Sequence, residues 1–502
     1  MKYFVLFISF VTALTGFSQV NHYKELYRPQ FHFTPSVNWT NDPNGLVFYK
    51  GKYHLFYQYN PFGNVWGHMS WGHAVSTDLV HWKHLPVAIP EENGTMIFSG
   101  SAVVDERNNA GFANKQGEQP LIAIYTGHYI ADTTNKENYL QSQNIAYSVD
   151  DGATWKKYKS NPVLDLQKKD FRDPCVFWYA PGKKWVMAVV LPQQHIVQFY
   201  GSPNLINWTH LSDFGPAGDV KDIWECPSLV QVPVIGTKQK KWVLFNSQQT
   251  TMQYFVGEFD GTKFTSQNPA ENIYRPDYGP DYYAGITYNH LPNNHPPVLV
   301  GWANNWTYAS TIPTYPWKSM MGLPRDLSLK KIDNEWLLFQ KPTAAIYTLH
   351  SPAWQGNKIN VEREKKIPVH SQQCELKLEW QPESNSVSGL QLAVGENKKL
   401  VIGYDAKENK LFLDRKNAGD TSFNKKFGEL SYYETKLPLR GKKLRLHVFF
   451  DHSIVEVFAN DGEAVMTMQI FPMPADDGIQ LFSDGGKNNF ENVQVWNMKS
   501  VW

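Results

Sequence analysis

Three short segments place an acidic side chain at the start of an apolar run, next to a proline or a cysteine. The first is Trp-Thr-Asn-Asp42-Pro-Asn-Gly, the second Phe-Arg-Asp173-Pro-Cys-Val and the third Trp-Glu225-Cys-Pro. Three carboxyl groups provide what acid/base chemistry on a glycosidic bond requires. One attacks the anomeric carbon, a second protonates the leaving oxygen and a third holds sugar hydroxyls. Spacing alone does not distribute these roles.

Each segment also has a simpler interpretation. Asp-Pro and Asn-Gly pairs favour turns around Asp42, an Arg172–Asp173 surface pair contributes little to stability, and an isolated glutamate is usually solvated. Glu225, however, lies between Trp224 and Cys226. Apolar surroundings disfavour a carboxylate, which suits a general acid. The shared position at the start of an apolar run favours the catalytic interpretation for all three.

A degenerate repeat predicts how these segments are held. Similar turns end in a large aromatic residue at Trp82, Trp155, Trp208 and, more weakly, Phe264. Each joins the end of one predicted strand to the start of another, and a strand-rich unit of roughly 40–50 residues is typical of a propeller blade. Four copies and a last apolar run at 298–303 predict five blades. Innermost strands converge on one axis, so carboxylates from different blades can meet there.

The second part of the chain has a different pattern. Helical periodicity is scarce before residue 340, and short strand runs separated by turn signals follow between residues 375 and 458. Such a pattern is typical of a β-sandwich. We therefore predict an all-β protein with a five-bladed β-propeller over residues 25–340, a linker over 341–359 and a β-sandwich over 360–502.

Composition narrows the class of function. The net charge is +1 with 19% charged residues, and no basic stripe is present, so nucleic acid is not an expected partner. The three cysteines, Cys175, Cys226 and Cys374, are too few for a disulfide framework. No cluster of Cys or His has the spacing of a zinc site, so we expect no metal and no cofactor.

The N-terminal residues 1–18 resemble a signal peptide, with Lys2 followed by an apolar run from Tyr3 to Leu14. The run is shorter than the roughly 20 residues that span a bilayer, and no later segment is long enough. No cysteine follows it, which argues against a lipid anchor. We expect a protein without membrane insertion that is secreted or periplasmic.

Taken in order, the motifs beginning at Asn41 (Asn-Asp-Pro-Asn-Gly), Phe98 (Phe-Ser-Gly-Ser), Arg172 (Arg-Asp-Pro) and Glu225 (Glu-Cys) resemble the signature motifs of glycoside hydrolase family 32. This family contains invertases, inulinases and levanases. The resemblance covers nearly the whole chain, including residues 451–462 of the predicted sandwich. It implies a five-bladed propeller followed by a β-sandwich, in agreement with the repeat.

The resemblance also implies roles. Asp42 would be the nucleophile that forms a covalent fructosyl-enzyme, Glu225 the acid/base and Asp173 a stabiliser of the transition state through fructose hydroxyls. A retaining mechanism of this kind predicts carboxyl groups roughly 5–5.5 Å apart for Asp42 and Glu225. Thr40 stands where family members often have Met, and we expect it to tune the fit. Residues expected to line the fructose subsite are Asn41, Gln58, Trp66, Phe98, Ser99, Arg172 and Trp302, with Asp281 as a further candidate that is equally compatible with a hairpin turn.

The segments 302–308 and 316–326 look more like bacterial exo-acting levanases and inulinases than sucrose-dedicated invertases. A channel closed at one end favours attack on chain ends. We therefore predict an exo-β-fructosidase for levan, inulin and sucrose. An invertase or fructosyltransferase of the same family and a non-catalytic fructan-binding propeller are the alternatives, while five-bladed arabinanases fit the Asn41 motif poorly. Linkage preference and oligomeric state, monomer or dimer, stay open.

Overall fold

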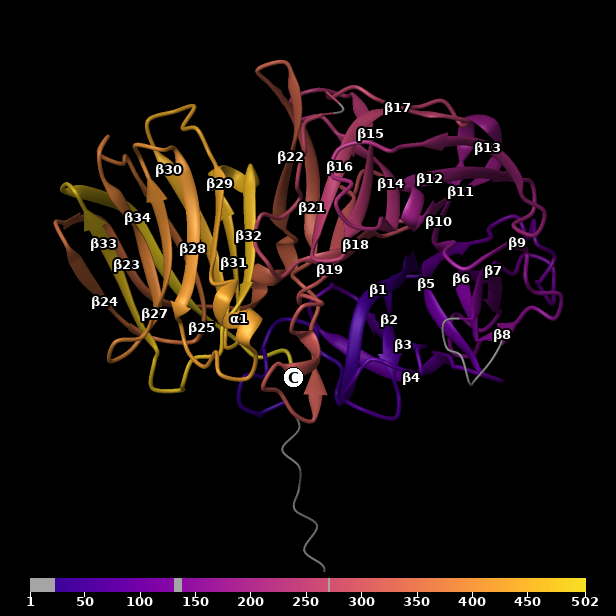
Figure 1. Ribbon diagram of the computed structural model, residues 1–502, viewed down its shortest axis with the longest axis horizontal. Coiled ribbons are helices and arrows are strands. Elements are labelled where there is room, and N and C mark those ends of the chain that lie inside the picture. Colours follow the sequence, from indigo (N-terminus) through magenta and orange to yellow (C-terminus); the bar gives the residue numbers. More distant parts are fainter. Residues whose placement is uncertain (1–22, 131–137, 270) are drawn as a thin grey trace, which may run out of the picture.

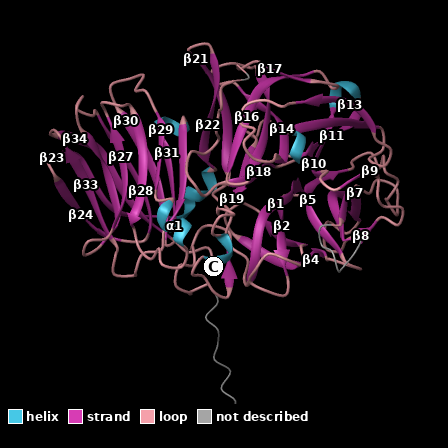
Figure 2. Ribbon diagram, in the orientation of Figure 1, coloured by secondary structure: helices cyan, strands magenta, loops and turns pink. Residues whose placement is uncertain are grey.

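The computed structural model describes residues 23–130, 138–269 and 271–502. The predicted signal peptide, residues 1–18, lies outside these ranges. Strands dominate the described residues and helices are few (Figure 2), so the all-β prediction is confirmed. Figure 1 shows two bodies side by side, one built from the first two thirds of the chain and the other, in orange and yellow, from the last third.

Within the described part of the chain, the first body contains five antiparallel sheets, each with four strands in chain order. Each of the first two sheets contains one additional short strand. β20 (Trp317–Lys318) pairs in parallel with β1 of the first sheet, and β9 (Leu164–Lys168) pairs with β7 of the second. The strands of the five sheets are β1 (Asn38–Tyr49), β2 (Lys52–Asn60), β3 (Ser70–Ser76) and β4 (Trp82–Ile89); β5 (Thr95–Val104), β6 (Leu121–Ile130), β7 (Tyr139–Ser148) and β8 (Lys156–Lys157); β10 (Arg172–Tyr179), β11 (Lys184–Leu191), β12 (Ile196–Ser202) and β13 (Thr209–Phe214); β14 (Glu225–Pro233), β15 (Lys240–Gln248), β16 (Thr251–Phe259) and β17 (Phe264–Ser266); β18 (Tyr283–Thr287), β19 (Val298–Trp302), β21 (Arg325–Ile332) and β22 (Glu335–Pro342).

The five sheets form a closed ring. The first strands contact one another in succession, β1 with β5, β5 with β10, β10 with β14, β14 with β18, and β18 again with β1. A separate cluster of buried apolar side chains fills the space between each pair of neighbouring sheets. Burial of both sheet faces therefore stabilises the ring, and the start of each first strand lies next to the central axis.

The repeat identified in the sequence corresponds to one structural feature, the turn from the third to the fourth strand of a sheet. Ser76, Ser148 and Ser202 end β3, β7 and β12, and the weaker fourth copy joins β16 to β17. The carboxylate of Asp78 accepts hydrogen bonds from the backbone of Val80 (3.0 Å) and His81 (2.8 Å). Asn204 and Asp260 make equivalent bonds. Side chains that cap their own turn explain why Asp and Asn recur there.

The second body consists of two six-stranded sheets over the described residues that follow Leu349. A large cluster of buried apolar side chains, from Val361 to Val495, lies between them. The first sheet has the order β23 (His350–Val361), β34 (Asn488–Met498), β25 (Gln373–Trp380), β30 (Leu444–Asp451), β31 (Ile454–Ala459) and β32 (Ala464–Gln469). The second has the order β24 (Glu364–His370), β33 (Gly478–Asp484), β26 (Val387–Val394), β27 (Lys399–Asp405), β28 (Lys410–Asn417) and β29 (Tyr432–Lys436). The helical segments are α1 (Lys425–Glu429) and the 3-10 turns η1 (Ala180–Gly182), η2 (Pro192–Gln194), η3 (Ala309–Thr311), η4 (Ala344–Leu349) and η5 (Asn460–Gly462).

The predicted linker over residues 341–359 is wrong at both ends. Lys341 and Pro342 still belong to β22, and residues 350–359 form most of β23, which pairs with β34. Only a short connection containing η4 separates the two bodies. Because β23 is an edge strand whose side chains are mostly exposed and polar, it lacks the apolar alternation by which a strand is recognised in a sequence.

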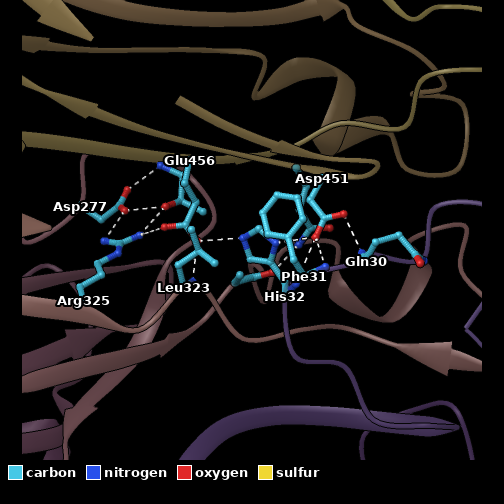
Figure 3. A network of polar contacts seen from close by, with 11 residues as sticks. Gln30, Phe31, His32, Asp277, Leu323, Arg325, Asp451 and Glu456 are labelled. Atoms are coloured by element: carbon cyan, nitrogen blue, oxygen red, sulfur yellow. Dashed lines mark hydrogen bonds and ion pairs between the residues drawn. The ribbon is translucent and has the colours of Figure 1, made fainter. Parts of the chain in front are cut away.

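A buried polar network joins the two bodies (Figure 3). Arg325 of β21 donates to Asp277 (2.9 Å) and to Glu456 of β31 (2.6 Å). His32 contacts Asp451 (2.8 Å) and Glu456 (3.1 Å) through its two ring nitrogens. Burial alone would lower the pKa of His32, but the two carboxylates outweigh it and raise the pKa to about 9. Buried charges paired in this way fix the second body against the ring.

No helix in the ranges that the structure describes has both the length and the apolar character needed to cross a membrane.

Candidate active site

The three acidic residues lie on first strands of the ring at points where strand pairing is irregular. The register of β1 with β2 shifts around Asp42, that of β10 with β11 around Asp173, and that of β14 with β15 just after Glu225. Asp173 and Cys226 take positive φ values of 63° and 48° there. Bulges re-aim side chains beside active sites, and here they turn all three carboxyl groups into one cavity.

The cavity opens at the end of the ring where the first strands begin and has a volume of about 300 Å³. Polar side chains and a few aromatic rings line it. These residues are Asn41, Asp42, Gln58, Trp66, Phe98, Ser99, His128, Tyr139, Gln141, Asp170, Arg172, Asp173, Glu225 and Trp306.

Asp42 is buried at the bottom of this cavity. Its carboxylate accepts hydrogen bonds from Ser99 Oγ (2.7 Å), Asn41 Nδ2 (3.1 Å) and Cys226 Sγ (3.5 Å). Burial raises the pKa of Asp42 and the charge of Glu225 raises it further, whereas the donors oppose the shift, so the pKa stays above its ordinary value. These contacts hold the Asp42 carboxylate in a fixed orientation.

Glu225 faces the same cavity but is more accessible to solvent. Arg172 donates to Glu225 Oε1 through Nε (3.2 Å) and Nη2 (3.1 Å), and the Tyr283 hydroxyl donates to Oε2. The apolar surroundings expected from Trp224 and Cys226 are therefore wrong, because the side chain points away from these sequence neighbours toward groups on other sheets. Arg172 and Tyr283, which belong to strands of two other sheets, thus orient the Glu225 carboxyl group at the mouth of the cavity.

Asp173 lies close enough to the other two acidic residues for their charges to affect its pKa. Its Oδ2 accepts from the backbone N–H of Cys226 (3.0 Å), and the Cys226 thiol lies 3.7 Å from the same oxygen. Burial raises the pKa of Asp173; Arg172 opposes this rise, while the charges of Glu225 and Asp42 add to it. A set of carboxyl groups with unequal surroundings is suited to separate roles in one reaction.

Most of the predicted subsite residues come together here. Asn41, Gln58, Trp66, Phe98, Ser99 and Arg172 all line the cavity with the three acidic residues. Whether they touch substrate stays a prediction.

Two predicted subsite residues do not reach the cavity. Asp281 is fully buried between the two bodies, where it accepts from Arg415 of β28 (2.9 Å) and the Tyr308 hydroxyl (2.6 Å). Trp302 is also fully buried and its indole nitrogen donates to Ser319. Both side chains are fully covered by protein, so the structure does not bring Asp281 and Trp302 into the cavity with the other predicted subsite residues.

Five other residues line the cavity and were not predicted from the sequence. Trp306, four residues after Trp302, lines the cavity and packs on Trp302 with ring centres 4.8 Å apart. His128 stacks on Phe98 at 4.5 Å. The other unpredicted lining residues are Tyr139, Gln141 and Asp170. Several Trp residues close together near residue 302 could have indicated Trp306 as a lining residue. By contrast, His128 of β6 and Tyr139 and Gln141 of β7 belong to no recognisable motif.

In the part of the chain that the structure describes, no group of three His, Cys, Asp or Glu side chains is arranged to hold a metal ion. Cys175, Cys226 and Cys374 are free thiols.

A ring of sheets that brings several carboxyl groups into one open cavity provides the pair of carboxyl groups that hydrolysis of a glycosidic bond requires, and it is the arrangement expected of a glycoside hydrolase. The family model described as the glycosyl hydrolases family 32 N-terminal domain matches residues 32–342, and the one described as glycosyl hydrolases family 32 C terminal matches residues 345–497. The chain belongs to glycoside hydrolase family 32.

Similar proteins support this membership. A levanase of Bacillus subtilis (strain 168) is 43% identical over 499 residues, which cover 96% of this chain and 72% of the levanase. An extracellular exo-inulinase of Aspergillus niger is 39% identical, with 98% of each chain covered. Among solved structures, an exo-inulinase from Aspergillus awamori superposes with a TM-score of 0.89 at 37% identity, covering 96% of this chain and 100% of that one. A β-fructofuranosidase from Schwanniomyces occidentalis complexed with fructosyl-erythritol gives 0.86 at 30% identity, covering 95% and 99%.

Proposed function

We propose that this protein is a secreted, retaining exo-β-fructosidase that hydrolyses terminal β-D-fructosyl bonds of levan, inulin and sucrose. The observation that carries the proposal is that Asp42 and Glu225 face one cavity from different sheets, one buried and one near the mouth. The similarity to a levanase and to extracellular exo-inulinases supports the substrate class and the secretion. We also infer that the ring is a five-bladed β-propeller and the second body a β-sandwich, joined by residues 343–349.

In the first step Asp42 attacks the anomeric carbon of the terminal fructose. The bond from this carbon to the bridging oxygen breaks, and Glu225 gives its proton to that oxygen, so that the rest of the substrate leaves as an alcohol. Arg172 orients Glu225 and Asp173 accepts hydrogen bonds from fructose hydroxyls. In the second step Glu225 takes a proton from water, the water oxygen attacks the fructosyl carbon, and the Asp42 carboxylate is released.

The far end of the ring supports attack on chain ends. The Asn289 side chain donates to the carbonyls of Ala102 (2.9 Å) and Val176 (3.0 Å), and its backbone N–H donates to Leu46 (2.9 Å). Asn289 is thus hydrogen-bonded to β1, β5 and β10, the innermost strands of the first three sheets, across the axis of the ring. A polymer cannot thread through a channel crossed in this way, which supports attack on chain ends.

The proposal is tested by chromatography of the first products from sucrose, inulin and levan with the purified protein. Fructose is expected as the first product from all three substrates. Oligosaccharides released first from both polymers would contradict the exo mode. Cleavage of sucrose alone would instead assign an invertase, and longer oligosaccharides built from sucrose would assign a transferase.

The acidic limb of the pH profile is expected to depend on Ser99. Its hydroxyl donates to the Asp42 carboxylate and so lowers the pKa of Asp42. In Ser99→Ala the pKa of Asp42 rises, and because the nucleophile acts only when ionised, the acidic limb of kcat/KM moves to higher pH. Ser101→Ala is the matched control, since Ser101 bonds only the backbone of the neighbouring strand β10. Identical acidic limbs for Ser99→Ala and wild type would show that this hydroxyl does not tune Asp42.

A further inference from the structure

Large apolar side chains gather on two loops that are hydrogen-bonded to the start of β1, the strand that carries Asp42. Phe62, Val65 and Trp66 lie between β2 and β3 and are 76%, 56% and 44% exposed, and Tyr315, just before β20, is 80% exposed. Among the described residues these are four of ten exposed large apolar side chains. Such concentration on one face marks a binding surface more often than chance exposure. We call Phe62, Trp66 and Tyr315 the aromatic rim.

The two loops that carry the aromatic rim lie side by side. The backbone amides of Asn38 and Trp39, at the start of β1, donate to the carbonyls of Pro316 (2.7 Å) and Gly63 (3.1 Å). Both loops are therefore attached to consecutive residues of the strand that reaches Asp42 three positions later. One member of the aromatic rim, Trp66, lines the same cavity as Asp42, and Phe62 and Tyr315 are more exposed.

The loop between β2 and β3 is built in a fixed shape. The Asn60 side chain accepts from the backbone of Phe62 (2.9 Å) and donates to the carbonyl of Val65 (2.8 Å). His68 packs edge-on against the Phe62 ring at 5.4 Å and contacts Glu91 (2.7 Å). A loop that already has its binding conformation loses little conformational entropy when a ligand binds.

The inner end of the aromatic rim is the cavity wall itself. Trp66 lines the cavity and meets Phe98 edge-on at 6.1 Å. Trp306 also lines it and is stacked on Trp39 at 5.9 Å. A fructosyl unit whose anomeric carbon is at Asp42 must send the rest of its chain out through this mouth, because Asn289 crosses the other end of the ring.

We propose that the aromatic rim binds the leaving-group side of a fructan chain, the sugar units that follow the terminal fructose. This inference rests on the proposed function and extends it to the part of the substrate outside the cavity. Flat aromatic faces contact the C–H faces of sugar rings while the hydroxyls stay in water, and Tyr and Trp provide such area at low entropic cost. Phe62 and Tyr315 are not among the residues that line the cavity, so we expect them to contact the later units of a polymer and not the single glucose that leaves from sucrose. The aromatic rim therefore selects polymer over sucrose.

The test uses the double variant Phe62→Ala/Tyr315→Ala of the full chain, with kcat and KM measured on sucrose, inulin and levan. We expect kcat/KM for the polymers to fall about tenfold through KM, because two exposed rings that contact the chain are removed together. For sucrose, kcat/KM is expected to stay within about twofold. Phe62→Trp/Tyr315→Trp keeps the flat faces and is expected to restore KM. Tyr432→Ala, which removes an aromatic side chain 50% exposed on the second body, is the control.

Equal losses on all three substrates, or unchanged KM for both polymers, would overturn the proposal. A change in oligomeric state of the double variant, measured by analytical ultracentrifugation, would instead show that the aromatic rim contacts a second copy of the chain, and would also overturn it. Failure of the proposed function is distinguishable, because it would show in the wild-type protein itself, which would then not release fructose as the first product from inulin or levan.

Discussion

Replacement of Asp42 by Asn is expected to lower kcat on sucrose by roughly 10⁴-fold or more, with KM close to that of wild type. The amide keeps the shape of the side chain and still accepts from Ser99, but it cannot form an ester with the anomeric carbon. Binding of the fructosyl unit depends on the other lining residues, which are unchanged. Steady-state kinetics on sucrose, with fructose as the measured product, give both constants.

Loss of folding is not expected to explain this result. Asp42 is one of three carboxyl groups gathered in a buried site, and the charge of Glu225 raises its pKa. Because neutralising one of several like charges relieves repulsion, Asp42→Asn is expected to keep or exceed the wild-type Tm. Asp151→Asn, in an exposed pair with Lys50 on the ring, is the matched control and should leave kcat unchanged. Equal turnover by Asp42→Asn and wild type would refute the assignment of the nucleophile.

Replacement of Glu225 by Ala is expected to lower kcat on sucrose by about 10²–10⁴-fold, the usual contribution of a general acid or base. The loss should depend on the leaving group. With β-fructosyl fluoride, fluoride departs without a proton, so the first step is largely restored while the second, which needs Glu225 to activate water, stays slow.

Azide provides a second readout for Glu225→Ala. The small anion fits the space left by the carboxylate between Arg172 and Tyr283, attacks the fructosyl carbon and releases Asp42, so β-fructosyl azide should accumulate. Glu225→Gln fills the same space and is expected to give no rescue, which makes it the matched control. Azide acceleration of both variants to the same extent would contradict the role of Glu225.

The structural features that depend on short local sequence patterns could be predicted from the sequence. The turns ending at Trp82, Trp155 and Trp208 predicted the repeated sheets because Asp and Asn cap their own backbone there. The same repeat placed Asp42 and Glu225 at the starts of first strands, and the ring then brings them to one cavity.

The features that depend on contacts between residues far apart in the sequence could not be predicted. Asp281 has the surroundings of a turn in the sequence, but its partner Arg415 lies 134 residues later on the second body. The environment of Glu225 comes from Arg172 and Tyr283, each on a different sheet. The edge strand β23 lacks an apolar pattern because little of it is buried. In each case the deciding contact exists only after the sheets have packed.

The most direct test of the account is to trap the covalent intermediate. Glu225→Ala would be mixed with β-fructosyl fluoride without azide, digested with a protease at acidic pH and analysed by peptide mass spectrometry. We predict that the peptide containing Asp42 carries one fructosyl residue and that the adduct disappears when azide is added. A fructosyl residue on Asp173, or release of fructose with no adduct on any peptide, would contradict the assignment of Asp42 as the nucleophile.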